Sequence, residues 1–166
     1  MKNKNLYFLL VGLMVLSFTF NSCKKDKTDS IQSLFTNGKW ELGSVIEYKY
    51  LGGQETNRDT LKCNNSQIFK FNDDMTCSYT NLDCKLSTVS GRWSLSDTRL
   101  FLFADITYPT VTTAGTKQPF INSRISNLGE FSMVLETGDL QTYFTSTDMR
   151  TIRRWGFIRI KPNVAQ

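Results

Sequence analysis

Four cysteines carry the most reactive side chains of this 166-residue chain: Cys23, Cys63, Cys77 and Cys84. A thiolate can act as a nucleophile or hold a metal, but each use needs suitable partners. The chain has no histidine, which excludes Ser-His-Asp and Cys-His catalysis and every His-ligated metal site. It also has no Cys-x-x-Cys pair, which argues against zinc. We therefore expect attachment and structural roles for the thiols, and neither a metal nor a cofactor.

Adjacent carboxylates at Asp73 and Asp74 are the other group whose type and spacing could do chemistry. They lie in Asn72-Asp73-Asp74-Met75, where aspartates make the local hydrogen bonds of a turn, and we prefer that interpretation to a cation site or an acid pair. Two carboxylates can support glycosidase-type chemistry, but no pair stands out for it. Leu51-Gly52-Gly53 lacks the lysine and the following helix of a phosphate loop. The sequence therefore does not predict an enzyme.

The first 22 residues have the three zones of an export signal. Lys2 and Lys4 form a cationic start, residues 6–20 form an uncharged and mainly apolar run, and the small Ser22 precedes Cys23. This order predicts a signal peptide over residues 1–22. The alternative, a retained transmembrane helix, is less favoured because the run falls short of the roughly 20 residues that span a bilayer.

The position of Cys23 adds a chemical role to this leader. Phe20-Asn21-Ser22-Cys23 resembles a relaxed lipobox, with an apolar residue three before the cysteine and a small one just before it. The following Lys24-Lys25-Asp26 is similar to the start of many lipoproteins of one large phylum of Gram-negative bacteria. The resemblance implies a diacylglycerol thioether on Cys23 and a fatty acyl group, such as palmitate, on the new N-terminus, which together anchor firmly. It places the protein in the cell envelope, on the outer membrane, with the side left open. The alternative is a plain signal peptide that ends near a cysteine.

Removal of the leader leaves a polar tether over residues 23–30 and a single domain over residues 31–166. The formal charge of +5 includes the two leader lysines, so the mature chain is only weakly basic. A nucleic-acid partner is not expected for such an exported protein. We interpret the cluster of Arg150, Arg153, Arg154, Arg159 and Lys161 as a solvated edge or loop.

The apolar pattern predicts one short helix and then strands. Ile31, Leu34 and Phe35 have the spacing of a helical stripe, which Ser30 could cap and Asn37-Gly38 ends. Short strands with frequent turns then predict an all-β domain, either a sandwich or an antiparallel up-and-down barrel of about eight strands, whose closure removes edges. The expected strands are 40–50 with a bulge near Gly43, 67–71, 77–82, 89–95, 99–104, 120–128, 131–136, 141–145 and 155–160, with long loops at 54–65 and 108–119.

The turn at residues 72–75 allows a test of cysteine pairing. A two-residue loop places Phe69 and Phe71 on a face with polar side chains, whereas a three-residue loop with a bulge at Met75 places Phe71 opposite Cys77 on one apolar face. Burial of a face fixes register, so we prefer the second arrangement. In both registers Cys63 and Cys84 lie at the open end of the hairpin, so we expect a disulfide between them. Cys77 then points inward as a small hydrophobe.

Several motifs, in order, resemble the small lipocalin-like domains of bacterial envelope lipoproteins. They are the run from Leu34 to Leu42 with its Gly-x-Trp motif, the Phe-Asn-Asp-Asp turn between two cysteines, Gly91-Arg92-Trp93-Ser94-Leu95, and the pair 125–128 and 131–135. The resemblance covers roughly residues 34–160. It implies a lipocalin-like β-barrel with a short N-terminal helical turn, closed at one end by Trp40. It also implies a late arginine stacked on Trp40, for which Arg153, Arg154 and Arg159 are equal candidates.

Two functions fit this outline. In the first, the barrel binds a small apolar or amphipathic ligand through inward aromatic side chains, the candidates being Trp40, Phe69, Phe71, Tyr79, Trp93, Phe101 and Phe103. In the second, the same side chains fill the barrel as its core, and the chain is an envelope accessory lipoprotein that meets a protein partner through its outer face and long loops. Both functions keep the membrane as a partner through the N-terminal lipid.

Two tripeptides, Asp29-Ser30-Ile31 and Asp59-Thr60-Leu61, resemble the short signal for O-glycosylation of exported proteins in the same phylum. They predict a modified hydroxyl at Ser30 or Thr60.

Overall fold

A computed structural model describes residues 26–108 and 118–160, so Cys23, the leader and most of the 108–119 loop lie outside the described residues. The described residues from Leu34 onward form one compact unit, which contains the whole sheet. Helix α2 spans Asp26–Thr36 and thus begins before the expected cap at Ser30. Residues 26–30, expected as part of a polar tether, are helical because they contain no glycine or proline that would end the helix. Within the described ranges no helix is long and apolar enough to cross a bilayer.

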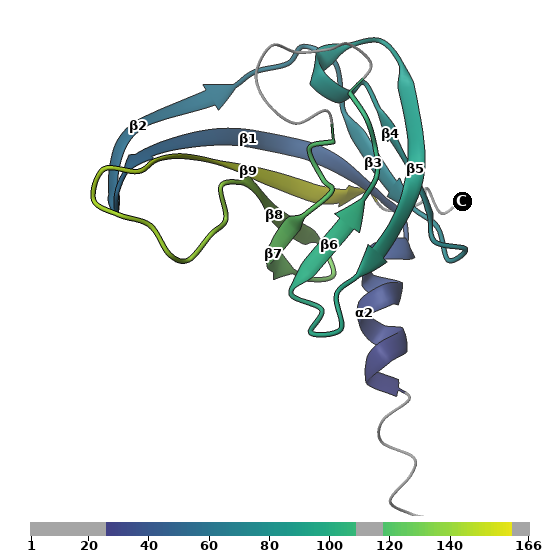
Figure 1. Cartoon of the computed structure of the whole chain (residues 1–166). Helices are drawn as coiled ribbons and strands as arrows, with labels where there is room; N and C mark the ends of the chain where they lie inside the picture. Colours follow the sequence, from purple (N-terminus) through teal and green to yellow (C-terminus); the bar gives the residue numbers. More distant parts are fainter. Residues whose placement is uncertain (1–25, 109–117, 161–166) are drawn as a thin grey trace, which may run out of the picture. The chain divides into compact units, whose positions relative to one another are not determined.

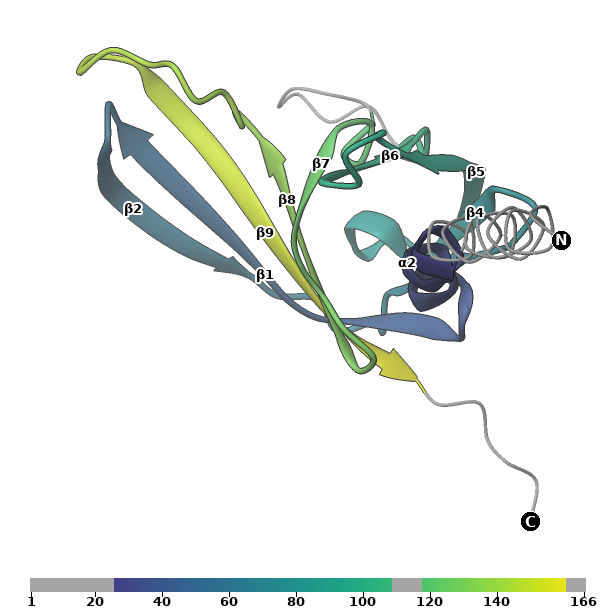
Figure 2. The same cartoon turned by 90° about the horizontal axis from the view of Figure 1, so that it is seen from below.

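The strands of the described residues form one antiparallel sheet that closes on itself (Figures 1 and 2). Each strand pairs with the next along the sheet, and β1 also pairs with β9, so β1 and β3 to β9 make an eight-stranded barrel with β2 as an extra strand. This confirms the expected barrel and its short N-terminal helix. The bounds are β1 Lys39–Leu51, β2 Gln54–Leu61, β3 Ile68–Phe71, β4 Thr76–Thr80, β5 Thr88–Leu95, β6 Phe101–Ala104, β7 Ser123–Leu128, β8 Ser132–Gly138 and β9 Met149–Ile160, with a 3-10 turn at Leu82–Cys84.

Strand β1 belongs to two parts of the sheet. Its first residues pair with β3, and its second half, from Val45 onward, pairs with β2 instead. The change follows the expected bulge at Gly43, where the β1–β9 register shifts between Leu42 and Ser44. Past the bulge, the ends of β1, β2 and β9 continue as a three-stranded extension, which we call the ribbon and which Figure 2 shows projecting from the closed barrel.

Two sequence expectations are wrong, one for the ribbon and one for the loop between β8 and β9. Residues 54–61 form β2 instead of a loop; every residue of β2 is exposed, so neither face covers a core and no apolar alternation marks the strand. Residues 141–145 form no strand, although they contain Tyr143 and Phe144. Strand propensity alone does not make a strand where no neighbouring strand is available to pair. Strand β9 in turn starts at Met149, six residues earlier than expected.

The hairpin between β3 and β4 has the preferred register. Phe71 lies opposite Cys77 and Phe69 opposite Tyr79, and Met75 takes the left-handed conformation at φ 62°. The apolar face of this hairpin is buried, which confirms that burial rather than turn preference sets the register.

Aromatic rings fill the closed part of the barrel. Phe69 contacts Phe71, Tyr79 and Phe120, with ring centroids 4.1, 5.0 and 5.1 Å apart. Trp40 is fully buried and donates its indole N–H to the carbonyl of Phe35 at 3.0 Å. The guanidinium of Arg159 lies 4.3 Å from the centroid of the Trp40 ring. Of the three candidate arginines, Arg159 therefore makes the expected stack.

Candidate ligand site at the mouth of the barrel

The seven aromatic side chains expected to face a ligand divide into two groups. Trp40, Phe69, Phe71 and Tyr79 are at most 1% exposed, and each of these four is packed among other core side chains. A ligand that reached them would have to displace this packing. Trp93 is 3% exposed and also lines, with Phe103, a recess of about 370 Å³.

The other two, Phe101 and Phe103, lie on the outer face of β6 because Leu102 and Ala104 take the buried positions. The inward placement expected for both was wrong. All four residues of Phe-Leu-Phe-Ala are apolar, so the two-residue periodicity could not show which pair of side chains points into the barrel.

Further open space lies at the mouth of the barrel, in two recesses where the ribbon leaves the closed part. The first holds about 520 Å³ and the second about 470 Å³, both within the size range of small-molecule sites. We call them the β8 recess and the disulfide recess. The β8 recess is lined by Glu47, Tyr108, Gln118, Pro119, Ile121, Asn122, Thr137, Gly138, Asp139, Thr151 and Arg153. The disulfide recess is lined by Leu42–Val45, Thr60–Asn65, Gln67, Asp83, Cys84, Tyr108, Arg153 and Trp155.

Tyr108 and Arg153 line both recesses and form the wall between them. Arg153 lies directly opposite Glu47 in the β1–β9 ladder, and its Nε donates to Glu47 Oε2 at 2.7 Å. Burial by itself lowers the pKa of Arg153, but the hydrogen bond and the charge of Glu47 outweigh it and hold that pKa above its usual value. Burial raises the pKa of Tyr108, so its phenol stays a neutral hydrogen-bonding group. The wall is thus a paired charge beside a neutral phenol.

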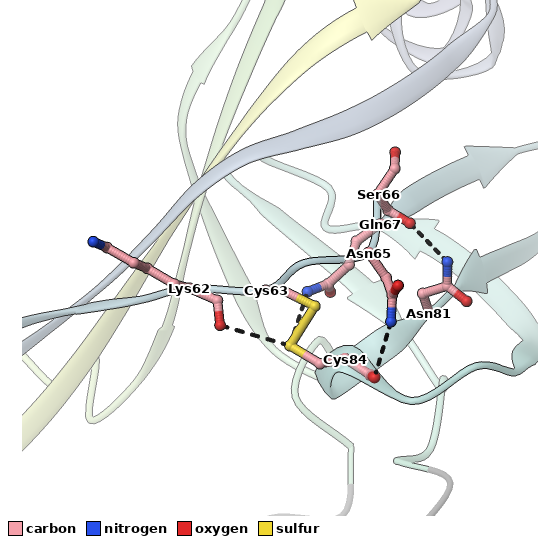
Figure 3. Close-up of a disulfide and its surroundings, with 7 residues drawn as sticks. All are labelled: Lys62, Cys63, Asn65, Ser66, Gln67, Asn81 and Cys84. Carbon is pink, nitrogen blue, oxygen red and sulfur yellow. Dashed lines mark hydrogen bonds between the residues drawn. A yellow bond between two sulfur atoms is a disulfide. The ribbon is translucent and has the colours of Figure 1, made fainter.

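The disulfide confirms the expected pairing and closes one side of its recess. Cys63 and Cys84 are bonded with Cα atoms 5.5 Å apart. Figure 3 shows the Gln67 amide reaching the sulfur of Cys84, with Nε2 3.9 Å from Sγ. Gln67 is 5% exposed, and its Oε1 has no hydrogen-bond partner within the described part of the chain. Asp83 and Cys84 both take the left-handed conformation, at φ 56° and 60°.

An apolar wall faces these polar groups. Val45 and Trp155, each 4% exposed, are partners across β1 and β9 and both line the disulfide recess. The indole N–H of Trp155 donates to Thr137 Oγ1 at 2.9 Å, and Thr137 lines the β8 recess. The mouth therefore offers aromatic and aliphatic surface next to a guanidinium, a phenol and an amide, which is the mixture that binds amphipathic molecules.

The remaining thiol has no part in this site. Cys77 is buried in the core and unpaired. Burial raises its pKa to about 12, so the nucleophilic thiolate is not populated at neutral pH. Among the residues that the structure describes, no group of three or more cysteine and carboxylate side chains could hold a metal ion.

Sequence reasoning missed the residues that line the mouth. Glu47 and Arg153 lie 106 positions apart, and only the register of β1 against β9 brings them together. Tyr108 lies at the edge of the expected 108–119 loop and Gln67 at the edge of the expected 67–71 strand. No periodicity or motif marks either residue as part of a site. Comparison with protein families, with curated proteins and with solved structures gives no match.

Proposed function

We propose that this chain is a lipid-anchored envelope protein that binds a small amphipathic ligand at the mouth of its barrel. One observation carries the proposal: the recesses on either side of Tyr108 and Arg153 are open, whereas the barrel interior behind them is filled by aromatic side chains. The closed antiparallel barrel is compatible with the lipocalin-like ligand binding that the sequence motifs imply.

The chemistry of the wall favours a ligand with a polar, hydrogen-bonding head and an apolar body. Arg153 is already paired with Glu47, so a strongly charged ligand gains less here than at a free cation. The body of the ligand would cover Leu61, an apolar residue of the disulfide recess that is 46% exposed. Removal of such surface from water supplies the main driving force of binding.

A fluorescent amphiphile tests the proposal. We expect the methyl ester of 11-(dansylamino)undecanoic acid to bind the purified mature chain with increased emission, and Tyr108→Ala to weaken binding about tenfold because a large, half-buried side chain worth about 1.5 kcal/mol is lost from the wall. The matched control is Tyr143→Ala, since Tyr143 is 92% exposed and outside both recesses. Equal loss in both variants, or no binding by the parent chain, would contradict the proposal.

The anchoring half of the proposal depends on Cys23, which lies outside the described residues. Its support is the lipobox resemblance and the leader. Cys23→Ala is expected to leave an uncleaved precursor or to release the domain from membrane fractions. Acylated mature protein from this variant, detected by mass spectrometry, would refute the assignment.

A second candidate function is that of an accessory lipoprotein that works through its outer surface, with the barrel as a filled scaffold. The packed interior and the exposed apolar side chains on the ribbon favour it. Recovery of one stoichiometric protein from solubilised envelope, with no lipid extracted from the purified chain, is the outcome expected for this function.

The glycosylation signal at Asp59-Thr60-Leu61 belongs to the same surface. Thr60 is exposed on β2 and also lines the disulfide recess. Ser30 lies where only the backbone is described. An intact mass above that of the acylated polypeptide, lost in Thr60→Ala or Ser30→Ala, is the expected sign of modification at either site.

A further inference from the structure

The outer end of the ribbon displays apolar side chains at unusual exposure. Tyr143 is 92% exposed, Met149 85%, Leu51 47% and Phe144 41%. Leu51 and Met149 are direct partners across β1 and β9, and Figure 1 shows the loop between β8 and β9 beside the turn between β1 and β2. We call residues 51–54 and 143–150 together the ribbon tip.

Apolar groups occupy both faces of the ribbon tip. By strand alternation Leu51 and Met149 continue the face that carries Glu47 and Arg153. Arg150, on the opposite face with Tyr50, stacks on the ring of Phe144 at 3.6 Å. A flat partner would cover one face only, whereas a medium that surrounds the tip would cover both.

The backbone of the ribbon tip is hydrogen-bonded within itself. Gly52 N–H donates to the carbonyl of Asp148 at 2.8 Å, and Arg150 Nη2 donates to the carbonyl of Gly52 at 3.0 Å. Gly52 is left-handed, and a Cβ there would lie 2.8 Å from the Cα of Ser146, so only glycine permits this approach. A segment that enters a lipid surface must satisfy its backbone hydrogen-bonding groups internally. At Gly52, where the two segments of the tip approach most closely, both the N–H and the carbonyl are hydrogen-bonded within the tip.

Arg150 is only partly compensated within the tip: hydrogen bonds from Thr145 and the charge of Arg150 together lower the pKa of the nearby Asp148. Arg150 is 8% exposed, its Nε has no hydrogen-bond partner among the described residues, and it takes part in no ion pair within them. Asp148 accepts a hydrogen bond from Thr145 N–H at 2.7 Å and limits how deeply the tip could enter. A guanidinium with an unused N–H donor is complementary to phosphate.

From these observations we propose that the ribbon tip docks onto a lipid surface. Tyr143, Phe144, Leu51 and Met149 enter the boundary between head groups and acyl chains, and Arg150 lies at the level of the phosphates. This contact is separate from the acyl anchor expected at Cys23 and from the recesses at the barrel mouth.

Vesicle binding of a chain without its acyl anchor tests the proposal. In the mature chain produced without its leader and without acylation, Tyr143→Trp places an indole at the tip, whereas Trp40, Trp93 and Trp155 are buried. We expect vesicles of phosphatidylethanolamine and phosphatidylglycerol to shift the new emission to the blue, and brominated lipids to quench it. The matched control is Leu86→Trp, since Leu86 is 82% exposed and lies away from the ribbon on the segment between η1 and β5; its emission should not change.

Two further measurements make the proposal falsifiable. The double variant Tyr143→Ser, Met149→Ser is expected to weaken vesicle binding about 25-fold, from about fivefold for each partly buried side chain, while Leu86→Ser leaves it unchanged. Phosphatidylcholine vesicles are expected to bind more weakly than the anionic ones because Arg150 makes no direct ion pair among the described residues. No spectral shift with either kind of vesicle, or equal effects of the tip and Leu86 variants, would overturn the proposal and leave a protein partner as the occupant of the tip.

Discussion

Removal of the Cys63–Cys84 disulfide is expected to lower the free energy of unfolding by about 3 kcal/mol. The bond closes a segment with a sequence separation of 21, and the loss of loop entropy from the unfolded chain for that length corresponds to about 3 kcal/mol. Cys63→Ser combined with Cys84→Ser removes the bond without an unpaired thiol. Urea denaturation followed by tryptophan fluorescence measures the change, and a loss below about 1 kcal/mol would refute the reasoning.

The backbone at residue 84 sharpens this prediction. Cys84 is left-handed at φ 60°, a conformation that costs a non-glycine residue about 1 kcal/mol and glycine almost nothing. With Cys63→Ser constant, Cys84→Gly should therefore be more stable than Cys84→Ser by about 1 kcal/mol if the turn keeps its shape. Equal urea midpoints for the two variants would mean that the turn at residue 84 rearranges once the bond is gone. The disulfide recess would then lose the side that Asp83 and Cys84 form.

Three further predictions concern the barrel. Arg159→Gln removes the stack on Trp40 and should cost about 2 kcal/mol in urea denaturation; Arg58→Gln, which breaks an exposed pair, is the control with little expected effect. Burial alone raises the pKa of Glu136, but hydrogen bonds from two arginines outweigh it and lower that pKa. The stabilising effect of Glu136 is thus present above the unfolded-state pKa and lost as pH falls through the folded-state pKa. Glu136→Gln should therefore flatten the decline in melting temperature below pH of about 4.5. The same decline in melting temperature in the variant and the parent chain would refute this role. Cys77 should resist iodoacetamide in the native chain at pH of about 8 and react in urea; native alkylation would contradict its burial.

The barrel could be predicted from the sequence because its closed part has strong two-residue periodicity. The pairing of Phe71 with Cys77 followed from placing one apolar face inward. The disulfide followed from the position of Cys63 and Cys84 at the open end of the same hairpin, which holds in either register. The ribbon could not be predicted, because strand β2 has no buried face and its pattern does not differ from that of a polar loop.

The candidate site escaped prediction for a related reason. Sequence reasoning placed the ligand among inward aromatics, yet the same bulky rings fill an eight-stranded barrel. Glu47 and Arg153 meet only through the long β1–β9 register, and no local spacing encodes that contact. The sequence narrowed the arginine that stacks on Trp40 to three candidates. The choice of Arg159 needed the register of β9 against β1, which places Arg159 opposite Trp40.

Quenching of Trp155 tests binding at the mouth most directly. Trp155 lines the disulfide recess, whereas Trp40 and Trp93 are packed with the core rings away from it. With 11-bromoundecanol as ligand, we predict saturable quenching that disappears in Trp155→Phe and persists in Trp93→Phe. Quenching that persists in Trp155→Phe would place the ligand elsewhere, and an absence of quenching in the parent chain would contradict ligand binding at the mouth.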